Sequence, residues 1–328
     1  MSEMSSRYEM IYKYSNDPNA YALLQSEMDY FHHGDSFLAF RKSNNTPVVL
    51  NDPVAEPDKL ESLIRLFTGK EKKSIFVNIS QEFASMLNGY GLEYRFCPYG
   101  TENIIDLSSS TYMDSKKIKS ALKKARKVDL KMNLIDFNSI SPEKLELLKT
   151  INQEFLDHTP SKKEITFISR GVELKNLQGV KFYELIYVEG ERNTTFGFIV
   201  LDPYFSNGDL TGYQLNAIRF RRTRIWGVYY SVVALLAKML KEEGFSSLSL
   251  GGLALDMFDV PSPFPHDKKM VKRITSLGKK ADKYYVVSNF TEMKLEFHGD
   301  RIRRYLAIPR DTSVSRSIFK FLRVSGMI

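Results

Sequence analysis

The sequence has a single cysteine and no long apolar run. Of its 328 residues only Cys97 carries a thiol, so no disulfide can form within the chain, which suits a reducing compartment. The most apolar segment, residues 228–240, is shorter than the roughly 20 residues that a helix needs to cross a bilayer. The start of the chain has no basic region followed by an apolar one, so we expect no signal peptide. These absences predict a cytoplasmic protein without a transmembrane segment.

The sequence also lacks the motifs of covalent catalysis and of metal binding. Gly-x-Ser-x-Gly does not occur, and five histidines and one cysteine offer no convincing Ser/His/Asp or Cys/His set. The doublet His32-His33 has no further ligand at metal-binding spacing, so we interpret it as a surface pair at a helix end. We therefore expect no metal and no cofactor.

What the sequence has instead is an excess of positive charge. Lysine and arginine total 47 against 39 acidic residues, which gives a formal net charge of +8. The composition, 43% hydrophobic and 26% charged, is globular, and the length allows two domains. Net charge alone fits either a polyanionic partner or a basic protein without one, because charge reports association and not fold. The clustering of the cations has to decide.

The strongest cluster lies in the segment DSKKIKSALKKARKV, residues 114–128. Its apolar residues recur at the spacing of one helical face, and Asp114 or Ser115 can cap the helix. The remaining faces carry seven cations without an intervening acid: Lys116, Lys117, Lys119, Lys123, Lys124, Arg126 and Lys127. This one-sided face favours contact with nucleic-acid phosphates. A solvated basic face and a face that rests on acidic lipid remain the alternatives.

Residues 212–257 are predicted to fold as a strand, a helix and a second strand. Alternation marks the first strand over 212–220, an apolar helix follows over 225–243, and such a crossover makes the two strands parallel. A helix that begins just after a strand offers unpaired backbone N–H groups to an anion. Four arginines crowd this position: Arg219, Arg221, Arg222 and Arg224. We add Arg222 and Arg224 to the predicted nucleic-acid contacts.

Elsewhere strands and helices alternate with short links, which predicts an α/β fold with a mixed sheet. We expect helices over residues 1–34 and 163–174, among others. The order of elements is similar in two parts of the chain, which indicates a duplicated fold. We place the two domains at residues 1–137 and 138–328, the second of which ends in a basic C-terminal tail.

A series of stretches between about residues 37 and 309 carries a family likeness. They are FLAFR with VVLNDPV, ISQEFASMLNGYGLEYRF with GTENIIDL, the basic helix with DLKMNLI, EITF, YQLNAIR, KEEGFSSLSLGGLAL and KLEFHGDRIRRYLAIP. In this order and spacing they resemble the soluble C-terminal domain of the bacterial phosphatidylglycerol lysyl- and alanyl-transferases. The resemblance implies two fused acetyltransferase-like (GNAT-like) domains. It also implies transfer of an amino acid from aminoacyl-tRNA to a lipid or small-molecule acceptor, with peripheral contact to an anionic membrane where the acceptor is a lipid.

Two motifs of that family differ here at one position each. The Asp-x-x-Arg strand motif falls on Asn216 and Arg219, so an amide stands in place of the carboxylate. The closing Lys-x-Lys-Phe motif falls on Lys294 and Glu296, so an acid stands in place of the second lysine, and the following Arg-Tyr-Leu begins at Arg304.

The reaction that the resemblance implies requires positioning, a route for a proton and stabilisation of an oxyanion, because the aminoacyl ester is already activated. Arg219, Lys294 and Arg304 are candidates to hold a phosphate or the oxyanion. Glu164 is the candidate to orient an ammonium group or accept a proton, and Asn216 can orient a substrate but cannot act as a base. A strand arginine paired with a carboxylate at the edge of the core is the alternative for Arg219.

Two other functions remain open. The first is an acyl-coenzyme A N-acyltransferase on the same fold, a class that resembles Arg/Gln-x-x-Gly-x-Gly/Ala at the start of the helix. The matching run here begins at Arg224 and ends at Tyr229, whose ring should obstruct the approach of a pyrophosphate to the backbone. The second is a non-catalytic module that binds RNA or anionic lipid.

Overall fold

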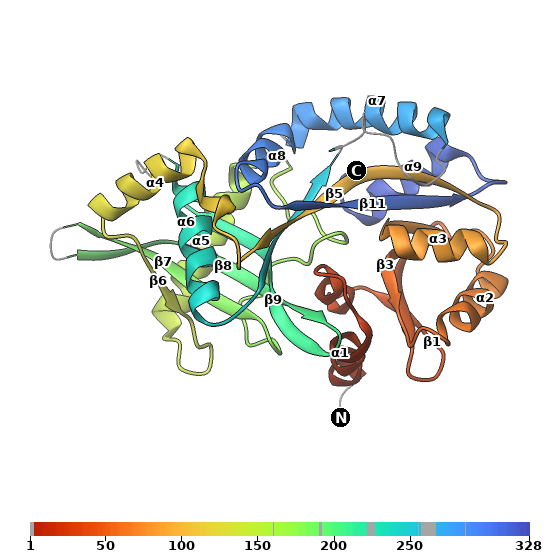
Figure 1. Ribbon diagram of the computed structural model, residues 1–328, viewed down its shortest axis with the longest axis horizontal. Helices are drawn as coiled ribbons and strands as arrows, with labels where there is room; N and C mark the ends of the chain where they lie inside the picture. The colour runs from red at the N-terminus through yellow and green to blue at the C-terminus, as the bar shows by residue number, and fades with distance from the viewer. Residues whose placement is uncertain are drawn as a thin grey trace.

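The computed structural model describes residues 3–159, 161–189, 192–221, 227–254, 256, 267–285 and 287–328. Within these ranges eleven strands form one continuous sheet, in the order β1-β2-β3-β4-β11-β5-β10-β9-β8-β7-β6 (Figure 1). The first part of the chain, red to orange, lies on the right of this view and the green part on the left. The predicted fold class, a mixed α/β fold with two similar halves, is confirmed.

The first half is a meander of antiparallel strands followed by a parallel crossover. β1, β2 and β3 are antiparallel neighbours, whereas β3 and β4 are parallel. Asn44 and Asn45 form the turn of the predicted β2–β3 hairpin, and both have a positive φ. The elements of this half are α1 (Glu3–Tyr14), the 3-10 helix η1 (Ala20–Leu24), β1 (Asp29–His32), β2 (Phe37–Ser43), β3 (Thr46–Val54), α2 (Leu60–Lys70), β4 (Ile75–Ile79), α3 (Gln81–Gly89) and β5 (Tyr94–Asp106).

The second half repeats this plan. β6 to β9 are antiparallel neighbours, and β9 and β10 are parallel on either side of α6, as the sequence predicted for this crossover. The elements are η2 (Thr111–Met113), α4 (Lys116–Lys127), β6 (Lys131–Leu134), α5 (Pro142–Asp157), β7 (Lys181–Glu189), β8 (Arg192–Ser206), β9 (Asp209–Phe220), α6 (Val228–Glu242), β10 (Ser247–Ala254), α7 (Lys268–Tyr285), α8 (Val287–Leu295), β11 (Asp300–Pro309) and α9 (Val314–Val324).

The last strand of each half lies beside the other half. β11, from the end of the chain, pairs with β4 of the first half, and β5 pairs with β10 of the second half. β5 and β11 also pair with each other at the centre of the sheet. The sheet is therefore continuous across the whole chain, and the domain boundary at residue 137 stays a prediction.

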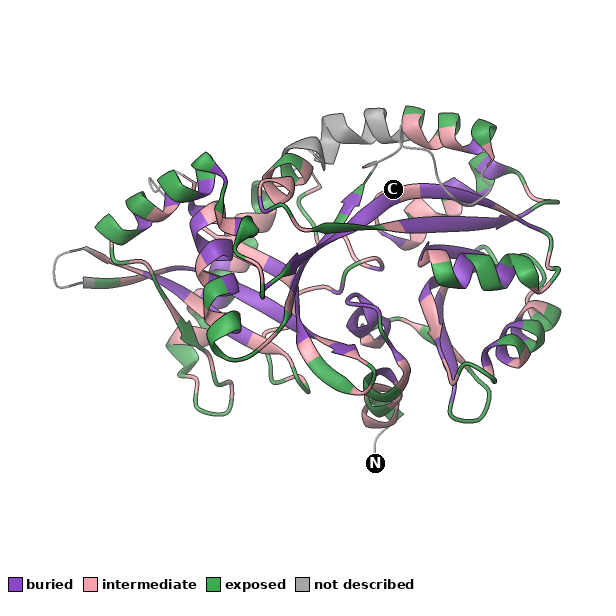
Figure 2. Cartoon of the chain, in the orientation of Figure 1, coloured by how far each residue is buried: buried purple, intermediate pink, exposed green. Residues whose placement is uncertain are grey.

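Helices cover both faces of the sheet (Figure 2). In the second half α4 and α6 pack on one face and α5 on the other. In the first half α2 and α3 cover one face, and α1, η1 and α9 cover the other. The apolar helix α6 is thus a core helix, with Val232 and Leu236 fully buried. No helix in the described part of the chain combines the length and the apolar character that crossing a bilayer requires.

Three predicted segments differ from the structure. The helix expected over residues 1–34 is α1 followed by η1 and the strand β1. The helix expected over residues 163–174 is absent from the described residues 163–174, because Phe167 has a φ of 82° and its backbone N–H and carbonyl both bond to the side-chain amide of Gln25. The basic tail contains the helix α9, whose Val314 and Ile318 join the core. The first two errors arise from contacts distant in sequence, which a local pattern cannot show.

Candidate functional site

Two pairs of parallel strands separate part of the way along their length. β3 and β4 pair as far as Leu50 and Val77, and β9 and β10 pair as far as Gln214 and Ser249. Beyond these residues all four strands continue, but the described residues show no further pairing within either pair. We call these two points the β3/β4 fork and the β9/β10 fork. Buried groups at a fork lack their strand partners, so other groups must satisfy them.

Side-chain amides fill the β3/β4 fork. Asn51 and Asn78 follow the last paired residues, and both have a left-handed backbone, with φ of 55° and 63°. Asn51 Oδ1 accepts hydrogen bonds from Asn78 Nδ2 at 2.7 Å and from Asn19 Nδ2 at 3.2 Å, and the Tyr99 hydroxyl donates to Asn78 Oδ1. Gln214 of the other fork donates to Asn19 Oδ1 at 3.0 Å, so one network joins the two forks.

The β9/β10 fork retains unused hydrogen-bonding capacity. Asn216 is the extra residue of a bulge in β9, between the paired residues Leu215 and Ala217. Its Nδ2 is buried and has no hydrogen-bond partner among the described residues. Across the fork Gly251 has a φ of 81°, a conformation that favours glycine. A bulge with an unpaired buried donor is a feature that recurs beside functional sites.

The bulge also changes the faces that the sequence predicted for β9. Continuous alternation would place Tyr213, Leu215, Ala217 and Arg219 on one face. In the structure Tyr213 and Leu215 pack with α6, whereas Ala217 packs with α5 on the opposite face. Arg219 is consequently directed to the side of α5.

Arg219 and Glu164 form one group of the predicted catalytic residues. Arg219 Nη2 donates to Glu164 Oε1 at 2.5 Å, and its Nε donates to Asn152 Oδ1 at 3.2 Å. The guanidinium group lies 4.6 Å from the centre of the Phe155 ring. Burial lowers the pKa of Arg219, and the neighbouring carboxylate of Glu164 opposes this shift. The two charged groups are therefore already paired with each other.

Lys294 belongs to a second group, around the carboxylate of Glu102. Lys294 extends from α8 to the β9/β10 fork, where its Nζ donates to the Gly252 carbonyl at 3.1 Å. Glu102 on β5 is 1% exposed and accepts a hydrogen bond from the hydroxyl of Ser249 on β10. Burial lowers the pKa of Lys294 to about 8, against the opposing effect of Glu102. Burial also raises the pKa of Glu102, which Arg304 and Ser249 counteract.

Arg304 forms the buried ion pair of the same group. On β11, its two terminal nitrogens donate to the carboxylate of Asp17 at 2.6 and 3.1 Å. Burial lowers the pKa of Arg304, but Asp17 and Glu102 outweigh burial and raise it. Asp52 lies close enough for the charge of Asp17 to act on it, and burial together with that charge raises the pKa of Asp52 to about 6. Arg304 thus anchors the loop between α1 and η1 to the centre of the sheet.

The cationic face of α4 is exposed as predicted. All seven of its lysines and arginines are exposed, while Ile118, Ala121 and Ala125 are buried. Ser115 caps the helix, and Glu296, just after α8, accepts hydrogen bonds from the side chains of Ser115 and Lys117. The N-terminus of α4 is therefore attached to the segment that carries Lys294. The remaining predicted contacts, Arg222 and Arg224, lie outside the described residues.

Tyr229 lies in the first turn of α6. Its ring centre is 6.4 Å from that of Phe297, and its hydroxyl is buried without a hydrogen-bond partner in the part of the chain that the structure describes. Gly227 precedes the helix with a φ of 72°. A bulky side chain thus occupies the start of the helix.

Several residues of the site escaped the sequence analysis: Asp17, Asn19, Asn51, Asn78, Glu102 and Gln214. Asn51 and Asn78 sit within apolar strand segments, VVLND and IFVNI. A polar residue inside a buried strand must find a partner, so these interruptions were the available signal.

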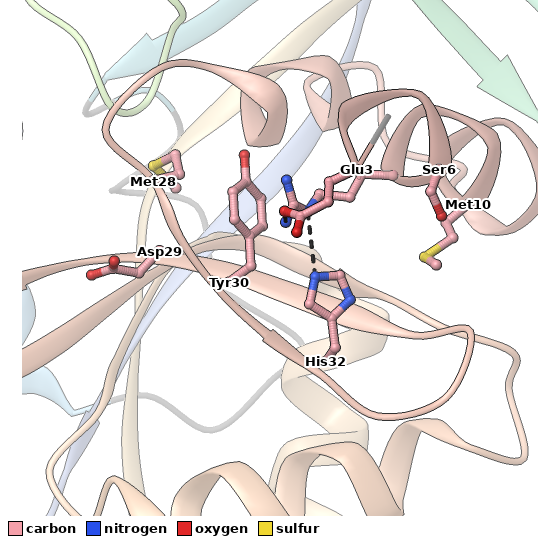
Figure 3. Close-up of a pocket in the computed structure, with 8 residues that line it drawn as sticks. Glu3, Ser6, Met10, Met28, Asp29, Tyr30 and His32 are labelled. Carbon is pink, nitrogen blue, oxygen red and sulfur yellow. Dashed lines mark hydrogen bonds and ion pairs between the residues drawn. The ribbon is translucent and has the colours of Figure 1, made fainter. Parts of the chain in front are cut away.

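A depression of about 450 Å³ between α1 and β1 is separate from the two forks (Figure 3). Arg7 lies 3.7 Å from the centre of the Tyr30 ring, donates to His32 Nε2 at 3.3 Å and pairs with Glu3 at 2.8 Å. Burial, with the charge of Arg7, lowers the pKa of His32. His32 lies on β1, not at the helix end expected from the sequence, and its arginine neighbour is already neutralised by Glu3.

The chain matches a family of known proteins over most of its length. Residues 9–308 match the family described as phosphatidylglycerol lysyltransferase, C-terminal. A phosphatidylglycerol lysyltransferase of Staphylococcus xylosus is 20% identical over 324 residues, which cover 96% of this chain and 37% of that protein. One of Staphylococcus epidermidis is 26% identical over 156 residues, which cover 45% of this chain and 18% of the relative. The chain thus spans well under half of the length of these relatives.

The fold has a similar counterpart among solved structures. The structure of L-PGS from Bacillus licheniformis superimposes with a TM-score of 0.80 and 20% identity, over 99% of this chain and 97% of that one. At this level of identity the likeness establishes the fold.

Proposed function

This chain belongs to the phosphatidylglycerol lysyltransferase C-terminal family, and we propose that it is an aminoacyltransferase that moves an amino acid from aminoacyl-tRNA to a lipid or small-molecule acceptor. The observation that carries this proposal is the arrangement of α4 beside the β9/β10 fork. Glu296 joins α4, with its seven exposed cations, to the segment of Lys294, and Lys294 reaches the fork. A polyanionic donor bound along α4 would present its aminoacyl end to groups at the fork.

The spacing of the cations on α4 supports a polyanionic partner over a merely solvated face. Lys119, Lys123 and Lys127 recur every four residues, and like charges at this spacing destabilise a helix by about 0.2–0.5 kcal/mol per pair. Lys116 and Lys117 in the first turn also oppose the helix dipole, where Glu296 compensates only in part. The phosphates of a bound RNA would attract these lysines, and this attraction would offset both the repulsion between them and their unfavourable interaction with the helix dipole.

The chemistry needs no covalent enzyme intermediate. The hydroxyl or amine of the acceptor attacks the ester carbon, the bond from that carbon to the ribose oxygen breaks, and the acceptor's proton ends on the departing oxygen. Asn216, whose amide nitrogen has no partner among the described residues, would donate an N–H to the carbonyl oxygen of the ester, on which negative charge develops. The paired Glu164 and Arg219 are candidates to orient the amino acid, and Arg304 positions the centre of the site through Asp17.

The acceptor determines how the protein meets a membrane. An aminoacyl-tRNA donor implies a reaction in the cytoplasm. A lipid acceptor would require peripheral contact with an anionic surface, for which exposed basic side chains are suited. A small-molecule acceptor would not.

The proposal is tested with bulk tRNA charged with labelled amino acids. The protein is added with phosphatidylglycerol vesicles in one reaction and with a small-molecule cell extract in another. We expect one labelled amino acid to leave the RNA and to appear in one of the two acceptor fractions. A folded protein that releases no label above spontaneous ester hydrolysis in either reaction would refute the function.

A further inference from the structure

Glu102 is a buried carboxylate that the proposed chemistry has not yet used. It lies at the centre of the sheet on β5, between β11 and β10 (Figure 1). It is 1% exposed, and its hydrogen-bond partner is the hydroxyl of Ser249. No described residue forms an ion pair with Glu102, and a buried carboxylate with a perturbed pKa is a candidate functional group.

The hydrogen bonds of Ser249 connect Glu102 to the bulge in β10. The backbone N–H of Gly251 donates to the Ser249 hydroxyl at 3.0 Å, and that hydroxyl donates to Glu102. β10 is irregular between Ser249 and Gly252, where its pairing with β5 shifts register. Glu102 therefore holds the backbone of the fork in the conformation that receives Lys294.

Gly251 brings the backbone of β10 close to the amine of Lys294. A Cβ at this position would lie 3.4 Å from Lys294 Nζ and 3.9 Å from Gln214 Nε2. Lys294 Nζ has the Gly252 carbonyl as its single hydrogen-bond acceptor among the described residues. The amine thus reaches the fork with capacity left for a substrate.

The charges around this pair come from four elements. Glu102 on β5 is the charged group that acts on Lys294. Arg304 on β11 and Asp17 in the loop after α1 act in turn on Glu102, and Asp52 on β3 acts on Arg304. Arg304 forms its ion pair with Asp17, and the charge of Glu102 acts on the amine of Lys294.

We propose that Glu102 is a positioning residue that holds Lys294 at the β9/β10 fork. Glu102 also sets the pH at which the amine of Lys294 becomes neutral and can take the proton of the acceptor. The inference rests on the proposed aminoacyl transfer. The neutral amine accepts the proton as the acceptor's oxygen or nitrogen bonds to the ester carbon. The resulting ammonium then returns that proton to the ribose oxygen as the ester bond breaks, so that no proton is gained or lost.

The sign of the pH dependence follows from the charges. Burial holds the pKa of Lys294 at about 8, below its ordinary value of 10.5, and the carboxylate of Glu102 raises it from a still lower value. The neutral amine, and with it the transfer rate, therefore increases as the pH rises through about 8. Glu102→Gln removes the negative charge, so the pKa of Lys294 falls and the rising limb of the profile moves to lower pH.

The first experiment measures the pH profile of transfer. Glu102→Gln should move the rising limb down by roughly one pH unit or more. Lys294→Arg, which stays protonated, should lower the rate at pH 8 by about 10² or more. A Glu102→Gln variant that loses rate without any shift of the limb would show that Glu102 is only structural and would overturn the proposal.

The second experiment does not depend on transfer activity. Competitive labelling of lysine amines with acetic anhydride, read by mass spectrometry at several pH values, gives the titration midpoint of Lys294. We expect a midpoint near 8 for Lys294, below the ordinary lysine value of 10.5, and a still lower midpoint for Lys294 in Glu102→Gln. These midpoints in a protein that transfers nothing would support the coupling of Glu102 to Lys294 and refute the transferase function alone. A midpoint of Lys294 at the ordinary value of 10.5, or one that Glu102→Gln leaves unchanged, would overturn the inference.

A milder variant covers the case in which Glu102→Gln does not fold. Ser249→Ala removes a hydrogen bond that stabilises the charged form of Glu102. Less negative charge then faces Lys294, so its midpoint should shift in the same direction by a smaller amount. A shift to higher pH would contradict the proposal.

Discussion

Reversal of two charges on α4 should weaken tRNA binding and reduce its salt dependence. Lys123 and Arg126 are exposed, lie one turn apart and form no ion pair with a described residue. Affinity falls as salt rises, and each lost phosphate contact makes the plot of log affinity against log salt shallower by about 0.7–0.9. Lys123→Glu with Arg126→Glu should therefore reduce the magnitude of the slope by about 1.4–1.8. Between about 50 and 200 mM salt, this difference alters the ratio of wild-type to variant affinity about tenfold.

A matched variant separates a specific surface from net charge. Lys72 and Lys73 are exposed in the link before β4, and their reversal to Glu changes the net charge by the same four units, from +8 to +4. Fluorescence anisotropy with labelled tRNA at four salt concentrations measures both slopes, and thermal melts verify folding. Equal losses in the two variants would mean that only net charge matters. Unchanged binding after the α4 substitutions would remove this helix from the interface.

Three further measurements test the contacts of Arg219, coenzyme A as an alternative donor, and the buried carboxyl group of Asp52. Arg219→Lys loses its planar contacts with Asn152 and Glu164, so turnover should fall by about 10² while the melting temperature stays close to wild type; full activity of Arg219→Ala would place the chemistry elsewhere. Coenzyme A at millimolar concentration should not raise the melting temperature, because Tyr229 occupies the start of α6; a ligand at 100 times its dissociation constant would stabilise by about 2.7 kcal/mol. Burial raises the pKa of Asp52 from 3.8 to about 6, so its carboxyl group binds a proton more tightly in the native state than in the unfolded state. The stability gained from this proton is lost as the pH rises from about 4 to 6. Asp52→Asn should therefore gain stability relative to wild type over that interval, and a pH-independent difference in melting temperature would contradict this.

The elements that the sequence predicted best are those with a complete local pattern. α4 has its cap at Ser115 and a one-sided cationic face, and both are present in the structure. The β9–α6–β10 crossover was predicted from a strand, an apolar helix and a second strand in succession, and its strands are parallel. Amphipathic spacing and short links act within a few residues, so the sequence reports them directly.

The site depends on features without a local pattern. The bulge at Asn216 shifts the alternation of β9, so that Ile218 and Phe220 pack on the same side as Leu215. A prediction that assumes regular alternation places them on the opposite face. The pairing of Arg304 with Asp17 joins residues 287 positions apart. The exchange of β5 and β11 between the halves brings Glu102 and Arg304 together, and no spacing within either half encodes it. Resemblance to a family indicated Lys294 and Arg304, but only the fold identifies their partners.

The two forks differ in how their side-chain hydrogen-bonding groups are used. In both halves, parallel pairing ends within the sheet, and residues with a left-handed backbone follow: Asn51 and Asn78 in the first half, Gly251 in the second. In the first half the amides of Asn51, Asn78 and Asn19 bond to one another within the core. In the second half Gly251 lies beside the amine of Lys294, and the amide nitrogen of Asn216 has no partner among the described residues. Because Gln214 bonds to Asn19 and Asn19 to Asn51, one hydrogen-bond network joins the first fork to the second, and we expect it to keep the proposed site preorganised.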